Sequence, residues 1–267
     1  MNLDNLLSIL IPAFLAGMLV LATHVPLGQQ VLNRGIVFID LAIAQVAGLG
    51  VTAASALGFE AEGWRVQAAA VGAALVGAVI LTWTEKIWPE VQEALIGVLF
   101  VVAACVELLL LANNPHGGEH LKDLLVGQIL WVQPQQLIPI AILYAVALMA
   151  WFTIRNRIGQ IGFYILFALV VTQSVQLVGI YLVFASLIVP ALAAKRFAEP
   201  LRLAVGYAVG IVGYVSGLVV SALFDLPTGA VIVVTLLGTM IIAVLFALAL
   251  PKGARAATAE KVAHATA

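Results

Sequence analysis

The longest uncharged stretch of the chain limits its fold more than any other feature. No charged residue occurs from Phe163 to Ala194, a run of 32 mostly apolar residues. A single helix needs about 20 apolar residues to cross a bilayer. The stretch therefore predicts either one long tilted helix or two short helices that meet near Gly179. It also carries Gln173 and Gln176 at lipid depth, where polar groups need protein partners.

The rest of the chain has the same apolar character. It is 64% hydrophobic and 9% charged, whereas a soluble domain has about 25% charged residues. Solid apolar runs, without the alternation of a β-barrel, predict an all-α polytopic membrane protein with a bundle of eight to nine transmembrane helices. We expect residues 1–250 to form a single transmembrane domain and residues 251–267 to form a disordered cytoplasmic tail. The predicted runs are 6–27, 36–58, 66–84, 94–112, 136–154, 160–194, 203–223 and 229–250.

The positions of the 12 Lys and Arg residues distinguish eight spans from nine. Basic residues collect on the cytoplasmic side of membrane proteins. With eight spans and the N-terminus inside, 8 of them lie on the cytoplasmic side and 4 on the outer side. With nine spans and the N-terminus outside, 10 lie on the cytoplasmic side and 2 on the outer side. The charge bias favours nine spans, although two of them would then have only about 16 residues, which is short for a bilayer. Eight spans remain the alternative.

Several function classes are excluded or disfavoured by missing features. The chain has no Gly-Lys dipeptide, so it lacks the GxxxxGK[ST] phosphate-binding loop, and it has no HExxH, GxSxG or CxxC motif. The net charge of −1 predicts no nucleic-acid partner, and the single Cys105 excludes an internal disulfide. We therefore expect no enzyme activity and no bound cofactor in this chain. If ATP drives it, another chain hydrolyses the ATP.

Ionisable and amide side chains inside the apolar runs are the remaining functional candidates. His24 lies late in the first run, Asp40 and Gln45 lie in the second, Glu93 opens the fourth, and Glu107 lies inside it. A carboxylate at lipid depth costs a few kcal/mol, so Asp40 and Glu107 should face a cavity or a partner. The alternative for each polar residue is an interhelical hydrogen bond, which contributes about 1 kcal/mol or less.

Five blocks of this sequence resemble the zinc/manganese-type metal permeases of ATP-binding-cassette (ABC) importers. GQQVLNRGIVFIDLAIAQVAGLG from Gly28 resembles the start of that family, whose helix carries SLIGDALSHAVLPG. QEALIGVLF at 92–100 resembles EDTAIGIVF, and LLVGQIL at 124–130 resembles YLFGNIL. SVQLVGIYLVFASLIVPALAAKR at 174–196 is similar to SLQVVGVLLVSALLIIPAATAR, and FDLPTGAVIVV at 224–234 is similar to LDLPSGPTIVL. The blocks follow the family's order over most of residues 28–240.

The chain departs from the family pattern at the expected metal ligands. An ungapped overlay places Gln45 at the histidine of DALSH, Leu41 at the aspartate and Asp40 at the preceding glycine. Asp40 and Gln45 are five residues apart and do not share a helix face. An amide is also a poorer zinc ligand than imidazole. A second departure lies at 154–162, where most of a longer family segment is missing.

The resemblance implies the permease subunit of an importer for a divalent metal ion such as zinc or manganese. It implies a homodimer, a cytoplasmic ATP-binding subunit, an extracytoplasmic metal-binding protein and a place in the bacterial cytoplasmic (inner) membrane. Gln176, Gly179, Asp225, Pro227 and Gly229 match motif positions of the resembling blocks. We expect the glycines and prolines among them to serve helix breaks and close packing. The alternative is a secondary transporter or channel for a cation or metal chelate, independent of ATP, with Asp40 and Glu107 as an ion relay; a membrane enzyme is disfavoured.

Two further expectations concern named residues. The basic segment from Lys195 to Arg202, with Lys195, Arg196 and Arg202 as its charges, should form a short cytoplasmic helix that docks on the ATPase. Asp40 should lie on the metal path, with Gln45 contributing at most a carbonyl. His24 is the candidate for the missing imidazole, because it lies about three residues before the predicted end of the first run and Asp40 about four residues after the start of the second.

Overall fold

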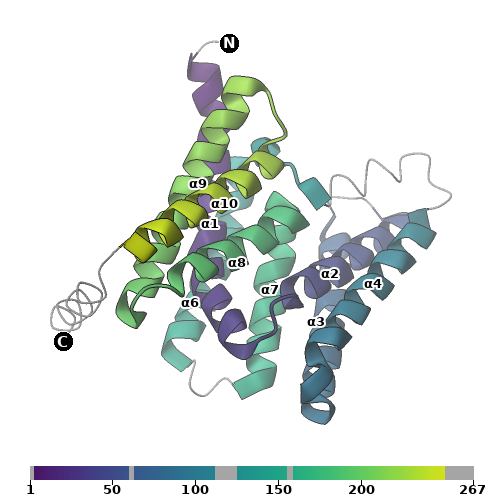
Figure 1. The fold of residues 1–267 in the computed structure, drawn as a ribbon. Coiled ribbons are helices and arrows are strands. Elements are labelled where there is room, and N and C mark those ends of the chain that lie inside the picture. Colours follow the sequence, from purple (N-terminus) through teal and green to yellow (C-terminus); the bar gives the residue numbers. More distant parts are fainter. Residues whose placement is uncertain (1–2, 60–62, 112–124, 155–158, 250–267) are drawn as a thin grey trace. The chain divides into compact units, whose positions relative to one another are not determined.

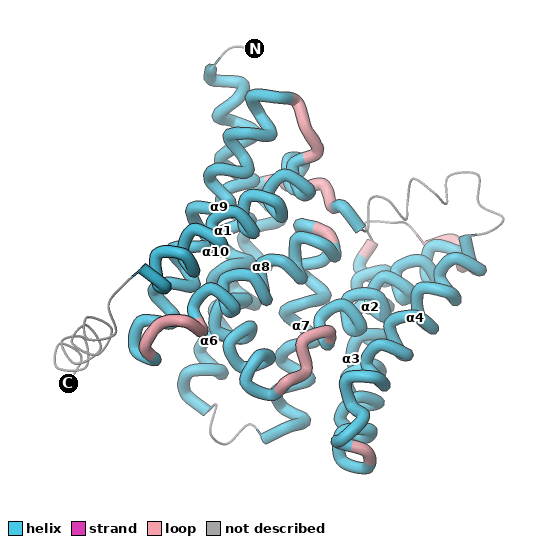
Figure 2. Tube along the Cα trace, in the orientation of Figure 1, coloured by secondary structure: helices cyan, strands magenta, loops and turns pink. Residues whose placement is uncertain are grey.

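The structure is a computed structural model that describes residues 3–59, 63–111, 125–154 and 159–249. All of its regular secondary structure in these ranges is helical (Figures 1 and 2), as predicted. Eight of the helices are long and apolar enough to cross a membrane, and Ile180–Ala194 is a shorter apolar helix. The described α-helices are α1 (Leu3–Arg34), α2 (Ile39–Ala56), α3 (Trp64–Ile87), α4 (Gln92–Leu111), α6 (Pro134–Ile154), α7 (Gly159–Val178), α8 (Ile180–Ala194), α9 (Arg202–Phe224) and α10 (Thr228–Ala249), with 3-10 turns η1 (Pro89–Val91), η2 (Ile129–Trp131) and η3 (Glu199–Leu201).

The helices fall into two compact units. The first unit comprises residues 1–34, 128–137 and 184–267, and the second comprises residues 35–127 and 138–183. The single domain predicted for residues 1–250 remains a prediction, and the predicted tail at 251–267 lies outside the described residues.

Helix α9 packs against α10 and α1 in the first unit through its small residues. A side chain at Gly217 would meet Ile232 of α10, and one at Gly210 would meet Leu21 of α1. Small residues let helices approach closely in lipid, where no hydrophobic effect drives their association. The hydroxyl of Tyr214 on α9 lies 2.8 Å from that of Ser186 on α8. This unit is therefore held by close backbone packing and a few buried polar contacts.

Helix α2 lies at the centre of the second unit and packs against α3, α4 and α7. A buried polar cluster joins three helices near the start of α4. The amide nitrogen of Gln92 donates to the carbonyl oxygen of Leu81 at 3.0 Å, and the hydroxyl of Thr84 donates to the Gln92 side-chain oxygen at 2.9 Å. The Gln92 amide also reaches the hydroxyl of Tyr164 on α7 at 3.5 Å. The side chain of Gln92 thus links α4 to α3 and α7.

The long uncharged stretch is two helices, α7 and α8, that meet at Gly179, which confirms this alternative of the sequence analysis. Gly179 has a φ of 80°, and Gly127 has a φ of 71°. Both angles belong to the left-handed region that glycine adopts readily. A Cβ atom on either glycine would overlap the backbone of the other segment. Backbone contact between these two positions thus explains why the helix breaks at this point.

Two expectations about helix ends were wrong. Helix α1 continues to Arg34 instead of ending near Leu27, because Pro26 and the polar residues that follow remain helical. The predicted helix at Lys195–Arg202 is a turn followed by the single 3-10 turn η3, with Pro200 at its start. Proline disfavours α-helical geometry in the residue before it, so Pro200 favours a break at Glu199.

Candidate functional site

Asp40 is the most unusual polar residue of the second unit. It is the second residue of α2, and it is 0% exposed. Neither of its carboxylate oxygens has a hydrogen-bond partner among the described residues. The backbone N–H groups of Asp40 and Leu41 lie nearby without reaching hydrogen-bonding geometry. A buried carboxylate without donors is costly, so this side chain requires a proton, a cation or another partner to be stable.

Glu93, at the start of α4, reaches the same end of α2. Its Oε1 atom accepts a hydrogen bond from the backbone N–H of Phe38 at 3.2 Å, and Phe38 directly precedes α2. The carboxylate thereby satisfies one of the N–H groups that a helix start leaves unpaired. Its other oxygen, Oε2, is buried and has no partner among the described residues. The sequence analysis did not assign Glu93 to the site, and the available indication was only that it opens the fourth apolar run.

Gln45 does not turn toward Asp40. Its amide nitrogen donates to Oε2 of Glu107 on α4, and the hydroxyl of Thr52 donates to Oε1 of Glu107 at 2.8 Å. Gln45 and Thr52 are seven residues apart, which places them on one face of α2. All three side chains are at most 2% exposed. Gln45 therefore makes an interhelical hydrogen bond, which was the alternative role considered for it. Its separation from Asp40 by five residues had already indicated that the two do not share a helix face. The sequence analysis did not foresee that Thr52 joins this contact.

His24 belongs to the first unit and is fully buried in α1. Its Nδ1 atom lies 2.9 Å from the carbonyl oxygen of Val20, and its Nε2 atom has no partner among the described residues. Because α1 continues ten residues beyond His24, about 15 Å of helix separates it from the end of α1. The depth match that supported a His24–Asp40 pair is therefore lost. The two residues lie in different units, and the pairing remains a prediction.

The motif positions lie mostly at breaks between helices. Gly179 separates α7 from α8, and Asp225 ends α9 in the left-handed conformation with a φ of 52°. The turn that follows contains Pro227, and Gly229 is buried in the first turn of α10. Gln176 is exposed on α7. These placements agree with the expected use of the glycines and proline for breaks and packing.

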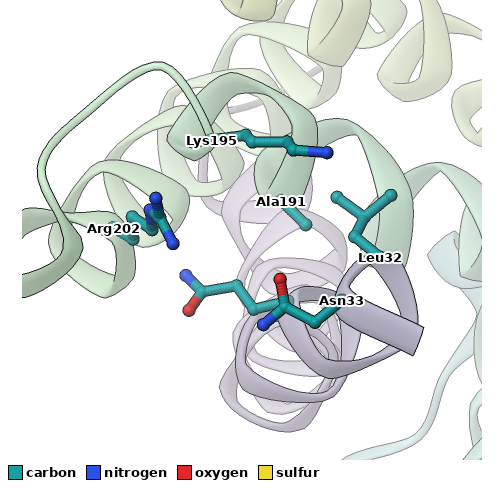
Figure 3. Close-up of a pocket in the computed structure, with 6 residues that line it drawn as sticks. Leu32, Asn33, Ala191, Lys195 and Arg202 are labelled. Carbon is teal, nitrogen blue, oxygen red and sulfur yellow. The ribbon is translucent and has the colours of Figure 1, made fainter. Parts of the chain in front are cut away.

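Two of the three predicted coupling residues, Lys195 and Arg202, line a small pocket of the first unit (Figure 3). Lys195 follows α8, Arg202 begins α9, and the pocket is also lined by Gln29 and Asn33 of α1. The Arg202 Nε atom donates to the carbonyl oxygen of Phe197 at 3.3 Å, which holds the loop between α8 and α9. The sequence analysis missed the amides of α1, because it ended that helix before them. The pocket combines two cationic and two amide side chains, which suits a carboxylate or another anionic group.

No cluster of three or more His, Cys, Asp or Glu side chains able to hold a metal occurs within the described residues. The described residues therefore do not form a structural zinc site, because such a site has four protein ligands. The arrangement offers one unpartnered carboxylate with a second one close to the same helix end.

The helices and their buried carboxylates define a multi-pass integral membrane protein of the transporter class. The chain belongs to the ABC 3 transport family, whose sequence model matches residues 7–158 and 153–247. The family membership confirms the resemblance described above. It makes the chain a transmembrane permease subunit, in agreement with its lack of a nucleotide-binding loop. The two matched segments overlap at 153–158, which includes the start of the region, 154–162, where the chain departs from the family pattern.

A solved structure supports the same fold. The chain is similar to a chain of "PsaBC from Streptococcus pneumoniae in complex with Fab", with a TM-score of 0.72 and 21% sequence identity. The similarity covers 88% of this chain and 90% of that chain. At this identity, the likeness establishes the fold and leaves the ligands of this chain to be argued from its own residues.

Proposed function

We propose that this chain is the permease subunit of an importer for a divalent metal ion, with zinc and manganese as the first candidates. The observation that carries the proposal is the family match along almost the whole helical chain. In this chain α2 also buries the Asp40 carboxylate, which has no hydrogen-bond partner among the described residues. A carboxylate at lipid depth is expensive and typical of an ion pathway. Family membership also favours ATP-driven transport over the secondary transporter considered above.

The proposal includes partners that the chain itself lacks. A cytoplasmic ATP-binding subunit hydrolyses ATP, and an extracytoplasmic metal-binding protein delivers the ion. Two copies of the chain form the transport path as a homodimer in the bacterial cytoplasmic membrane. Lys195, Arg196 and Arg202 contact the ATP-binding subunit, and the pocket between α1 and the α8–α9 loop receives an acidic side chain from it.

Asp40 lies on the metal path in this proposal. Asparagine has nearly the same size as aspartate but no charge. Asp40→Asn should therefore abolish metal uptake without loss of expression. Ser216→Ala, a small polar change on α9, serves as a control that should leave uptake intact.

The test is ATP-dependent uptake of radioactive Mn²⁺ and Zn²⁺ into proteoliposomes that contain the chain, its ATP-binding subunit and the metal-binding protein. Uptake that needs ATP and disappears in Asp40→Asn supports the proposal. Uptake of neither metal by the wild-type assembly refutes the proposed substrates, and uptake without ATP revives the secondary transporter. Normal uptake in Asp40→Asn removes Asp40 from the path.

A further inference from the structure

Helix α3 has one buried side and one exposed side in the second unit. On the buried side, a side chain at Gly77 would contact Ile43 and Val46 of α2. The exposed face of α3 consists of Val76, Val79, Ile80, Trp83 and Ile87. Each of these side chains is at least 41% exposed. Because a helix turns by about 100° per residue, the five side chains project within about one third of its circumference.

An apolar face of this kind requires a cover, because contact with water is unfavourable for it. In a chain that spans a membrane, the cover is either lipid or a second copy of the chain. Helices that associate in a membrane do so mainly through small residues, which let their backbones approach. The exposed face of α3 carries branched aliphatic and aromatic side chains instead. Its composition therefore favours lipid, although the exposed small residues Ala68 and Gly72 lie nearer the start of the helix.

Both ends of α3 combine a tryptophan with a basic residue. Trp64 is the first residue of the helix and is 75% exposed, and Trp83 lies near the other end. Arg65 follows Trp64, and Lys86 lies in the last turn. Tryptophan rings collect at the headgroup level of a membrane, and long basic side chains extend their charge to the phosphates. Each end of α3 therefore has the composition of an interfacial anchor.

The separation of the two anchors matches the thickness of a bilayer. Trp64 and Trp83 are 19 residues apart, and an α-helix of that length extends about 28 Å. The hydrocarbon core of a bilayer is about 30 Å thick. The two rings can thus lie at opposite membrane surfaces, with the aliphatic residues of the exposed face in the hydrocarbon between them. Contact with a second copy would not require this spacing.

Aromatic contacts organise both anchors. The guanidinium carbon of Arg65 lies 5.5 Å from the ring centroid of Phe59 and 5.8 Å from that of Trp64. A guanidinium that stacks on rings keeps its N–H donors in its own plane, which suits the oxygens of a phosphate. At the other end, the rings of Trp83 and Trp88 meet edge to face with their centroids 5.8 Å apart.

We propose that the exposed face of α3 is a phospholipid-binding surface in the assembled transporter. Trp64 and Arg65 contact headgroups of one leaflet, and Trp83 and Lys86 contact headgroups of the other. Acyl chains cover the aliphatic side chains between the two anchors. A second copy of the chain then docks on another surface, and this holds whichever ion is transported.

The test measures tryptophan fluorescence of the purified full-length chain in phosphatidylcholine vesicles whose acyl chains carry bromine as a short-range quencher. Trp64→Phe and Trp83→Phe should each lower the quenched fraction of the fluorescence. Bromine near the headgroup should quench these two residues more than bromine near the chain ends. Val76→Trp adds a probe between them and should show the opposite depth preference. Trp151→Phe is the matched control, because Trp151 on α6 is 4% exposed and its removal should raise the quenched fraction.

A second measurement distinguishes lipid from a second copy of the chain. Cys105→Ser removes the single native thiol. In this background, Gly72→Cys and Val79→Cys are each treated with an oxidant in vesicles at a low ratio of protein to lipid. We expect no disulfide-linked dimer, and we expect both thiols to react with a lipid-soluble maleimide. Thermal unfolding in the same vesicles identifies any variant that has lost its fold.

Three results would overturn the proposal. A disulfide-linked dimer through either introduced cysteine would show that a second copy covers this face. Trp64 or Trp83 that no brominated lipid quenches would show that lipid does not reach that end of α3. Quenching of the two tryptophans mainly by bromine near the chain ends would refute their contact with headgroups.

Discussion

Replacing Gly179 by alanine should destabilise the protein more than its small size suggests. The φ of 80° costs an L-residue about 1–2 kcal/mol. The new Cβ atom would also lie 2.6 Å from the carbonyl carbon of Val126 and 2.7 Å from Cα of Gly127. Backbone atoms cannot rotate away, and overpacking of this kind costs about 1–3 kcal/mol. The sum predicts a loss of about 2–5 kcal/mol in the free energy of unfolding.

Two other glycines separate these contributions. Gly35 has a φ of 72° and no described atom within 4 Å of a new Cβ, so Gly35→Ala should show the strain of about 1–2 kcal/mol alone. Gly97 lies inside α4 with open space around it, and Gly97→Ala should be neutral or stabilise the helix by up to about 1 kcal/mol.

The assay is denaturant unfolding in mixed micelles, followed by tryptophan fluorescence. The expected order of stability is Gly97→Ala, wild type, Gly35→Ala and then Gly179→Ala. If Gly179→Ala lost no more stability than Gly35→Ala, the backbone contact between Gly127 and Gly179 would not be the reason for the helix break.

Three further predictions follow from other parts of the chain. Reversing the charges of Lys195 and Arg196 should uncouple ATP hydrolysis from uptake or prevent assembly with the ATP-binding subunit; a variant that assembles and transports normally would contradict this role. Gln92→Leu should lower the free energy of unfolding by about 1–3 kcal/mol, because it removes the acceptor of Thr84 and the donor to Leu81; unchanged denaturant unfolding would show that the cluster contributes nothing. Gly118→Cys, in a segment outside the described residues, should react with an impermeant thiol reagent in intact cells if the chain has nine spans; labelling only after the cytoplasm is opened would favour eight.

The helical class and the division of the long apolar run were predictable, because both follow from local composition. Gly179 stands in the middle of residues 163–194, and the limited thickness of a bilayer required either a tilt or a break. The end of α1 was not predictable in the same way. Gln29 and Arg34 have the polarity of a linker, but this end of α1 packs against α8, where a side chain at Gly28 would overlap the carbonyl oxygen of Leu187.

The site was predictable only as separate residues. The sequence placed Asp40 and Glu107 at lipid depth, but Gln45 and Glu107 are 62 residues apart, and nothing local indicates that they meet. The same holds for Glu93 and Phe38, which are 55 residues apart. Pairing between helices depends on their rotation and order in the bundle, which apolar runs do not encode because every face of such helices is hydrophobic.

The short length of α8 has a consequence for how the protein responds to its membrane. With 15 residues, α8 is about 22 Å long, whereas the hydrocarbon core is about 30 Å thick. Most of its side chains are buried, with Tyr181 and Leu192 as its exposed residues. Lipid therefore contacts little of α8, and hydrophobic mismatch does not set its length. Lipids with longer or shorter acyl chains should shift helices such as α4 and α10, whose apolar residues are largely exposed, while α8 keeps its place.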